Sequence, residues 1–319
     1  MAELIRGIEN FHRPQGPLVL TIGNFDGVHL GHQRILSRLR HRARALRARA
    51  VALSFEPHPL RVLRPHVPLK LLTPLEEKAR LMGLYGVDTL VLARFDEAFA
   101  RLGPEEFIQR VLVEVFAPQE VVVGSGYAFG RGRRGSTELL RRRGRRWGFR
   151  LHVVRAVRLG GQVVSSSRVR SVLEAGRVAE ALRLLARPYM VEGPVVRGTG
   201  RGGRLLGIPT ANVQSTYELL PKRGVYAVKV MAAGRLYEAV ANLGENPTFG
   251  GQGLSLEVHL LRYHGGGLLG QSLRVFFYER LRAEHRFGDP QALKEAILRD
   301  IARAEEFFRQ KGRRLPGPL

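Results

Sequence analysis

The sequence predicts two parts: an α/β part built on a Rossmann-like parallel sheet, then an all-β part that closes into an antiparallel barrel. Up to about residue 157, short apolar runs alternate with amphipathic stretches, a repetition typical of a parallel sheet covered on both faces. The pattern changes after Arg187-Pro188, where strands follow one another through glycine-rich turns, as in antiparallel barrels. We therefore expect one domain over residues 1–186 and another over residues 187–319.

Length and composition limit the classes of protein that this chain can belong to. Its 319 residues are 44% apolar, which is enough for two packed cores. The sequence contains no cysteine, so disulfides, thiolate metal sites and cysteine nucleophiles are excluded. It has no run of 18 apolar residues and no signal-peptide pattern at its start. We expect a cytoplasmic protein with no membrane partner.

The formal charge of +24 comes mostly from arginine and has two interpretations. A basic surface can bind nucleic acid, or arginine can be a compositional habit while small phosphorylated substrates supply the anions. The arginines are scattered, and the densest cluster, residues 131–150, holds one tryptophan for base stacking. This favours small anionic substrates and no nucleic-acid partner. The arginine run at 141–146 is interpreted as a solvated helix face.

The expected elements of the first part alternate along the chain. Pro74 and Pro104 stand where helices begin, since a first-turn position needs no N–H. Ligands of such sheets bind beyond the carboxyl ends of the strands. The predicted strands cover residues 18–23, 51–55, 89–95, 121–124 and 151–157, and the predicted helices lie near 31–47, 74–85, 104–115 and 136–147.

The second part is expected to follow two short helices at 168–175 and 178–186. Ala232-Ala233-Gly234 is a hairpin signal between strands. A closing helix at 290–310 carries an apolar stripe that we assign to core packing, formed by Leu293, Ile297, Ile301 and Phe308. The predicted strands cover residues 225–231, 235–242, 254–261 and 272–278.

The strongest local signal is the string Gly-Asn-Phe-Asp-Gly-Val-His-Leu-Gly-His at 23–32, between an apolar strand and a helix. A helix N-terminus offers free N–H groups and a positive dipole end to phosphate. His29 and His32 are three positions apart, so both can reach one cleft and stabilise charge on a transferred phosphoryl group. A lone His-x-x-His is more often a pair of capping or exposed histidines, but the full string favours a nucleotide site.

A second polar string, Gly-Ile-Pro-Thr-Ala-Asn at 207–212, lies in the barrel part. Thr210 and Asn212 face the same side of an extended segment, and their oxygens are hard ligands suited to Mg²⁺. Alternation along 254–260 places Glu257 and His259 on one strand face. Glu257 can serve as the general base for a hydroxyl near Mg-ATP, although a single strand glutamate is more often solvent-facing. His259 is interpreted as a structural neighbour.

Together these strings resemble the bifunctional riboflavin kinase/FMN adenylyltransferase family, the prokaryotic FAD synthetases. In the first half the resemblance rests on residues 23–32, 54–59, 122–124, 129–130 and 165–170, in the family's order. It implies that His29 and His32 are catalytic. It also implies an ATP/FMN-binding set, namely Gly23, Asn24, Phe25, Asp26, Gly27, Gly31, His58, Ser166, Ser167, Arg168 and Arg170.

In the second half the resemblance rests on residues 193–198, 202–212, 242–244, 246–249, 257–260 and 282–287. It implies a six-stranded riboflavin kinase barrel with a closing helix, a catalytic Glu257, and Mg²⁺ held by Thr210 and Asn212. It also implies a kinase ATP/flavin-binding set, namely Gly198, Arg204, Gly207, Pro209, Thr210, Asn212, Asn242, Arg282 and Glu284.

The resemblance implies that riboflavin is phosphorylated to FMN and FMN is adenylylated to FAD, with ATP and Mg²⁺. One departure concerns Gly126 and Tyr127, where the family usually has Asn or Asp followed by Phe. The alternatives are therefore a riboflavin kinase with a weakened adenylyltransferase half, a different nucleotidyltransferase, and a nucleic-acid-binding protein that kept the fold. The sequence does not indicate an oligomeric state.

Overall fold

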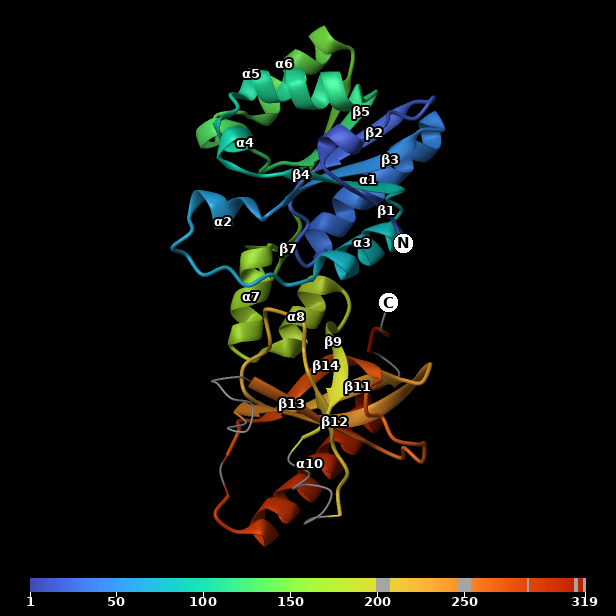
Figure 1. Cartoon of the computed structure of the whole chain (residues 1–319), viewed down its shortest axis with the longest axis vertical. Coiled ribbons are helices and arrows are strands. Elements are labelled where there is room, and N and C mark those ends of the chain that lie inside the picture. Colours follow the sequence, from blue (N-terminus) through green and yellow to red (C-terminus); the bar gives the residue numbers. More distant parts are fainter. Residues whose placement is uncertain (199–206, 246–253, 286, 313–314, 318–319) are drawn as a thin grey trace. The chain divides into compact units, whose positions relative to one another are not determined.

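The structure is a computed structural model that describes residues 1–198, 207–245, 254–285, 287–312 and 315–317. Contacts divide the chain into two compact units, Met1–Ser166 and Ser167–Leu319 (Figure 1). The helices expected at 168–175 and 178–186 therefore group with the second unit. A functional boundary at 186 stays a prediction. None of the helices in the described parts combines the length and hydropathy of a membrane-spanning segment.

The first unit is built on a six-stranded sheet with the order β1-β4-β3-β2-β5-β6. Every neighbouring pair is parallel, as the sequence predicts. The order turns back at β2, because β3 follows on one side of it while β5 lies on the other. The strands are β1 (Glu3–Arg6), β2 (Leu18–Ile22), β3 (Arg49–Glu56), β4 (Thr89–Arg94), β5 (Glu120–Gly124) and β6 (Arg150–Val154).

Helices cover both faces of this sheet, and a separate apolar core lies under each layer (Figure 1). One core joins α1 and α3 to the sheet, and the other joins η2 and α6 to it. A small hairpin, β7 (Arg158–Leu159) with β8 (Gln162–Val163), precedes the end of the unit. The helices are α1 (Leu30–Leu46), α2 (Pro59–Leu63), α3 (Leu75–Leu84), α4 (Glu97–Arg101), α5 (Pro104–Glu106), the π-helix η2 (Phe107–Phe116) and α6 (Thr137–Trp147), with short 3-10 turns η1 (Ile8–Asn10) and η3 (Arg131–Arg133).

The second unit contains a closed six-stranded barrel, in which every neighbouring pair is antiparallel. The strand order is β10-β13-β12-β11-β14-β9. Positive φ angles at Ala233 (47°) and Gly234 (74°) form the β11–β12 hairpin turn that the sequence predicts. The strands are β9 (Tyr189–Val196), β10 (Ala211–Val213), β11 (Gly224–Ala232), β12 (Arg235–Glu245), β13 (Leu254–Leu260) and β14 (Ser272–Arg282).

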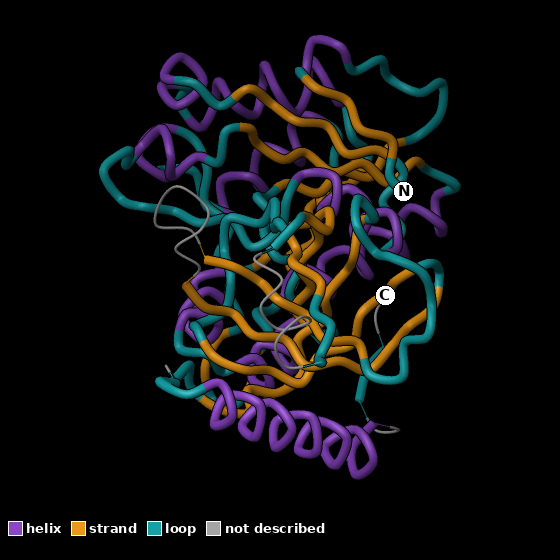
Figure 2. The backbone as a smooth tube through the Cα atoms, turned by 60° about the horizontal axis from the view of Figure 1, so that its bottom comes forward, coloured by secondary structure: helices purple, strands orange, loops and turns teal. Residues whose placement is uncertain are grey.

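In the described part of the second unit, three helices accompany the barrel: α7 (Ser166–Glu174), α8 (Val178–Leu185) and α10 (Pro290–Lys311). Helix α8 contacts β9 and β14, and α10 lies along β11, β12 and β14, as Figure 2 shows for the long helix beside the barrel. The predicted core stripe of α10 is correct at Phe308 and displaced by part of a turn at its other three positions. Leu293, Ile297 and Ile301 are only half-buried, whereas the buried positions are Ala296, Asp300, Ala304 and Phe308.

Candidate functional sites

The nucleotide-binding candidate lies where the strand order of the first unit reverses. The chain leaves the carboxyl end of β2 after Ile22, turns through residues 23–28, and enters α1 at its N-cap, His29. Ligands of open parallel sheets bind at such switch points. The first turn of α1 contains no acidic residue that would offset its positive dipole end. The local fold therefore presents an anion-attracting helix end where the sequence places the nucleotide site.

The turn after β2 is held in an unusual backbone conformation. Phe25, Gly27 and Val28 all have positive φ angles, at 51°, 79° and 39°, which is rare for side chains such as Phe and Val. Burial of the Phe25 and Val28 side chains holds them in place. The N–H of Val28 donates to the Phe25 carbonyl at 3.1 Å. Such conformations persist where packing over-determines them, often at functional sites.

The structure brings the two histidines together. Their ring centroids lie 3.7 Å apart with 18° between the ring planes. His29 is 5% exposed, and its Nδ1 accepts a hydrogen bond from the His32 backbone N–H at 3.4 Å. The Phe25 ring meets His32 edge-on at 5.3 Å. The two imidazoles therefore form one stacked pair at the start of α1 rather than two separate surface groups.

Asp26 stabilises the turn after β2 through hydrogen bonds. Its buried carboxylate accepts hydrogen bonds from the backbone N–H groups of Leu72 and Thr73, at 2.9 and 3.3 Å. Its carbonyl accepts a hydrogen bond from the Ser166 hydroxyl at 2.9 Å, and the N–H of Gly27 donates to the Thr73 hydroxyl. The Asp26 side chain is thus engaged by protein backbone and holds the loop in shape.

The other residues predicted for this site have mixed surroundings. His58 caps α2, and its Nδ1 accepts a hydrogen bond from the Leu60 N–H at 3.2 Å. Ser167, Arg168 and Arg170 belong by contact to the second unit, where Arg168 pairs with Glu180 at 3.0 Å. Gly126 is exposed, with open space where a Cβ would be.

Lys78 on α3 is a buried charge that sequence reasoning missed. Its burial lowers its pKa, while the carboxylates of Asp26 and Glu56 act in the opposite direction. The signal was present, because Leu75, Lys78, Ala79 and Met82 follow an i, i+3, i+4, i+7 spacing, which places the lysine on the inner face of the helix. Lys78 links α3 electrostatically to the turn after β2.

The second candidate site is a polar row across three strands of the barrel. Glu257 on β13 is directly opposite Asn212 on β10 and also directly opposite Asn242 on β12. Directly paired residues project their side chains to the same face of a sheet, about 5 Å apart. Glu257 is half-buried, and burial raises its pKa. The sequence predicted Asn212, Asn242 and Glu257 separately, and the register places them in contact range.

Asn212 offers an unused oxygen in this row. It is 9% exposed, and its Oδ1 is buried without a hydrogen-bond partner among the described residues. Gly198 makes room for this amide, because a Cβ there would lie 2.0 Å from Asn212 Nδ2. A buried acceptor without a partner is costly, so the geometry suits an external donor or a cation at this oxygen.

The segment before β10 is fixed by a histidine. His259, two residues after Glu257, places its Nδ1 2.8 Å from the Pro209 carbonyl oxygen. Thr210, Pro209 and Gly207 are exposed, and Gly207 has a φ of 70°. The hydroxyl of Thr210, the amide oxygen of Asn212 and the carboxylate of Glu257 are all oxygen ligands of the type that Mg²⁺ takes, so these residues fit that ion.

Arg282 and Glu284, which the resemblance assigns to ATP or flavin binding, have protein partners in the structure. The Arg282 guanidinium donates to both oxygens of Asp300 on α10, at 2.8 to 3.0 Å, and lies 5.7 Å from the Phe287 ring. Glu284 packs against Gly244 so closely that a Cβ there would lie 2.1 Å from its Oε1. Arg204 and the predicted residues 246–249 lie outside the described residues.

Comparisons with known proteins match the two halves of the chain separately. A family model described as FAD synthetase matches residues 12–168, and one described as riboflavin kinase matches residues 185–308. A bifunctional riboflavin kinase/FMN adenylyltransferase of Pseudomonas fluorescens is 40% identical over 304 residues, covering 95% of this chain and 96% of its own. The enzyme of that name from Escherichia coli K12 is 39% identical over 308 residues, covering 96% and 98%.

A solved structure from Streptococcus pneumoniae, described as a macrolide-efflux protein, has the same fold. It matches with a TM-score of 0.86 at 28% identity, covering 97% of this chain and 98% of its own.

Proposed function

Because this chain belongs to the family of bifunctional riboflavin kinases/FMN adenylyltransferases, we propose that its barrel unit phosphorylates riboflavin to FMN and its parallel-sheet unit adenylylates FMN to FAD, with ATP as the donor in both reactions. Consecutive matches to both family models over almost the whole chain carry this proposal. Two groups of polar residues, the stacked histidines and the Asn212–Glu257–Asn242 row, support the proposal because they offer each reaction a separate candidate site.

The kinase step needs a base, since the ribityl hydroxyl of riboflavin is a weak nucleophile. Glu257 orients that hydroxyl and accepts its proton as the oxygen attacks the γ-phosphorus of ATP and the bond to the β-phosphate oxygen breaks. Its raised pKa strengthens it as a base. Thr210 and Asn212 hold Mg²⁺, which neutralises phosphate charge when bound with ATP. His259 keeps the backbone at Pro209 in place beside them.

The adenylyl transfer needs no base, because the FMN phosphate is already an anionic nucleophile. One of its oxygens bonds to the α-phosphorus of ATP while the bond from that phosphorus to the bridging oxygen breaks, and pyrophosphate leaves. Positioning and charge stabilisation therefore dominate. The first N–H groups of α1 and the His29–His32 pair donate hydrogen bonds to the phosphate chain, and Asp26 with Ser166 keeps their turn in shape.

Chromatographic analysis of the flavin products tests this division of labour. We expect the purified chain with riboflavin, ATP and Mg²⁺ to form FMN and then FAD. FMN without FAD would favour the alternative of a weakened adenylyltransferase half, to which the exposed Gly126 would contribute. Salt-sensitive nucleic-acid binding without ATP turnover would favour the nucleic-acid alternative.

Two substitutions assign the reactions to the two sites. Glu257→Ala is expected to lower FMN formation by about 10²- to 10⁴-fold, the usual contribution of a general base, and to leave FAD formation from supplied FMN intact. His29→Ala is expected to lower FAD formation by about 10²- to 10³-fold and to leave the kinase intact. Ser255→Ala, on the same strand face as Glu257, is the matched control. Equal loss of both reactions in both variants would contradict the assignment.

A further inference from the structure

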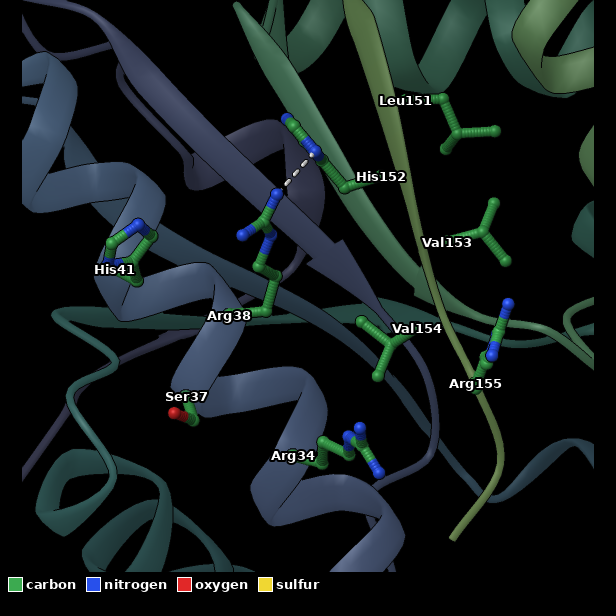
Figure 3. Close-up of a pocket in the computed structure, with 9 residues that line it drawn as sticks. All are labelled: Arg34, Ser37, Arg38, His41, Leu151, His152, Val153, Val154 and Arg155. Atoms are coloured by element: carbon green, nitrogen blue, oxygen red, sulfur yellow. Dashed lines mark hydrogen bonds between the residues drawn. The ribbon is translucent and has the colours of Figure 1, made fainter.

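A groove with a strongly basic lining runs along one side of α1, between this helix and the edge strand β6 (Figure 3). Its volume is about 660 Å³, within the range of about 300 to 1,000 Å³ typical of small-molecule sites. Its lining contains three arginines, two histidines and no carboxylate, namely Arg34, Ser37, Arg38, His41, Leu151, His152, Val153, Val154 and Arg155.

The spacing along α1 arranges these cations in a line. Arg34, Arg38 and His41 follow an i, i+4, i+7 pattern, so they share one helix face and extend over about 10 Å of its length. All three are exposed. Across the groove, Arg155 follows the end of β6 and is also exposed. Neither Arg34 nor Arg155 forms a salt bridge with any residue that the structure describes. The groove therefore keeps uncompensated positive charge.

A chain of polar contacts links the wall of the groove to the buried Glu120. The Arg38 guanidinium lies 3.3 Å from Nδ1 of His152, as the dashed line in Figure 3 marks, and Nε2 of His152 lies 2.9 Å from Glu120. Glu120 is 4% exposed and is already bonded to Arg42 through two contacts of 2.7 Å. Burial, with Arg38 and Arg42 nearby, lowers the pKa of His152 although Glu120 opposes this. The Glu120 carboxylate is thus matched by Arg42, and Arg38 forms no salt bridge with a carboxylate of the described residues.

One end of the groove lies toward the start of α1, which follows the nucleotide turn. The N–H of Ser125, just beyond β5, donates to the Val154 carbonyl at 2.9 Å, and Gly124 lies against Ile35 of α1. Arg34 is within two turns of the N-cap His29. Because β5 is the parallel neighbour of β2 and β6 is the parallel neighbour of β5, Arg155, just beyond the carboxyl end of β6, lies at the same edge of the sheet as the nucleotide turn.

We propose that this arginine groove is a docking track for the phosphate-bearing substrates of the adenylyl-transfer step, which it attracts and passes to the turn after β2. The inference rests on the proposed function of the first unit. A cleft lined by one sign of charge raises the local concentration of an oppositely charged ligand and its association rate by about 10- to 10³-fold. Salt weakens this attraction, since charges on exposed groups are screened over about 10 Å at 0.1 M ionic strength.

The test compares the double variant Arg34→Gln/Arg38→Gln with Arg141→Gln/Arg145→Gln. The control removes the same charge from two exposed arginines of α6 in the same unit, so it measures the effect of net charge alone. The readout is kcat/KM for FAD formation at low and at high salt, with ATP varied at fixed FMN and FMN varied at fixed ATP. The two series show which phosphate-bearing substrate docks.

At low salt we expect the groove variant to lose about tenfold in kcat/KM, with kcat unchanged because the stacked histidines remain. The loss should shrink at high salt, and the control should stay within twofold of the wild type. Riboflavin kinase activity of the same chains should not change. Equal kcat/KM values for the groove variant and the control, or a loss confined to kcat, would overturn the proposal.

Two further outcomes are informative. If the wild-type chain forms no FAD, the proposed function of the first unit fails. The docking proposal is then tested by FMN binding to the wild type and the groove variant, measured through flavin fluorescence. Salt-sensitive weakening in the groove variant alone would then support docking, whereas unchanged binding would overturn it. Single-stranded RNA that binds this groove more tightly than FMN or ATP would also overturn the proposal in favour of a nucleic-acid site.

Discussion

His259 makes one hydrogen bond whose contribution to the kinase reaction can be tested. Its Nδ1 lies 2.8 Å from the Pro209 carbonyl, next to the proposed magnesium ligand Thr210. One hydrogen bond contributes about 0.5–1.5 kcal/mol, which corresponds to a change of about 2- to 13-fold. We expect His259→Ala to raise the KM of the kinase for ATP by such a factor and to leave FAD formation from supplied FMN unchanged.

Steady-state kinetics of both reactions on the same preparation provide the measurement. His259→Asn is the companion variant, because its side-chain N–H can restore a donor to the Pro209 carbonyl, and it should recover part of the loss. An unchanged KM for ATP in His259→Ala would show that Pro209 is held by other contacts.

Lys78 leads to a prediction about pH. Burial is the larger effect and lowers its pKa below the value of the unfolded chain, about 10.4. Between the lowered and the ordinary pKa the unfolded chain binds more protons than the folded chain, so the free energy of unfolding rises with pH in that window. Lys78→Met removes this contribution, so the free energy of unfolding of the variant should rise less steeply with pH in that window.

Denaturant unfolding of the first unit at several pH values checks the slope. Lys222→Met, which removes an exposed lysine of the barrel unit, is the control and should retain the wild-type slope. Parallel curves for wild type and Lys78→Met would show that Asp26 and Glu56 fully offset the burial of the ammonium group.

At the scale of elements, two ion pairs join the closing helix to the barrel unit among the described residues, Arg262–Glu305 and the buried pair Arg282–Asp300. The Arg282 guanidinium on β14 donates hydrogen bonds to both carboxylate oxygens of Asp300 on α10. Asp300 is 2% exposed. Removing one partner of a buried pair leaves a charge without compensation and costs about 3–5 kcal/mol. Asp300→Ala should therefore destabilise the barrel unit by about that amount, and Arg282→Met/Asp300→Leu should be more stable than Asp300→Ala alone.

Thermal unfolding measures this difference, and kinase assays well below the transition add a second result. The resemblance assigns Arg282 to substrate binding, whereas the structure shows it engaged by Asp300. If Arg282→Met/Asp300→Leu folds and keeps the kinase KM values, Arg282 has a structural role. If it folds but loses affinity for ATP or riboflavin, Arg282 also contacts substrate.

The elements with a strong periodic pattern were the ones that the sequence could predict. The buried strands β2 to β5 each contain a run of apolar residues, so their positions follow from the sequence pattern. Strand β1 is a four-residue edge strand with mixed exposure, and nothing in its pattern distinguishes it from a loop. The helix predicted at 104–115 exists, but its residues from Phe107 form a π-helix, whose hydrogen-bond shift leaves no signal in the spacing.

For the candidate sites, the sequence predicted single residues but not how these residues pair in space. Motifs identified His29, His32, Asn212 and Glu257, because each stands in a string with chemical meaning. The directly opposed pairing of Glu257 with Asn212 and Asn242 depends on barrel register, which is set by contacts between segments distant in the sequence. The partners of Asp26 and Arg282 also come from distant segments, so their bracing roles emerge only in three dimensions.

At the scale of the whole molecule, helices α7 and α8 lie largely between the segments that the two family models match. The FAD synthetase match ends at residue 168 and the riboflavin kinase match begins at residue 185. Helix α8, between them, contacts β9 and β14, and its Ala181, Leu184 and Leu185 are fully or almost fully buried. The N–H of Lys222 also donates to the Leu173 carbonyl at the end of α7. Both helices are therefore part of the barrel unit's packing, although the sequence pattern placed them in the first domain.

Two fragments decide where the kinase unit begins. A fragment of residues 167–319 keeps α7 and α8, whereas one of residues 187–319 exposes the apolar surface of β14 and β9 that α8 covers. Full burial of a Leu side chain contributes about 1.5–3 kcal/mol, so losing Leu184 and Leu185 alone removes several kcal/mol. We expect the longer fragment to unfold at a higher temperature and to phosphorylate riboflavin, and the shorter one to aggregate or melt early. Equal stability and equal kinase activity of the two fragments would support the predicted functional boundary at 186.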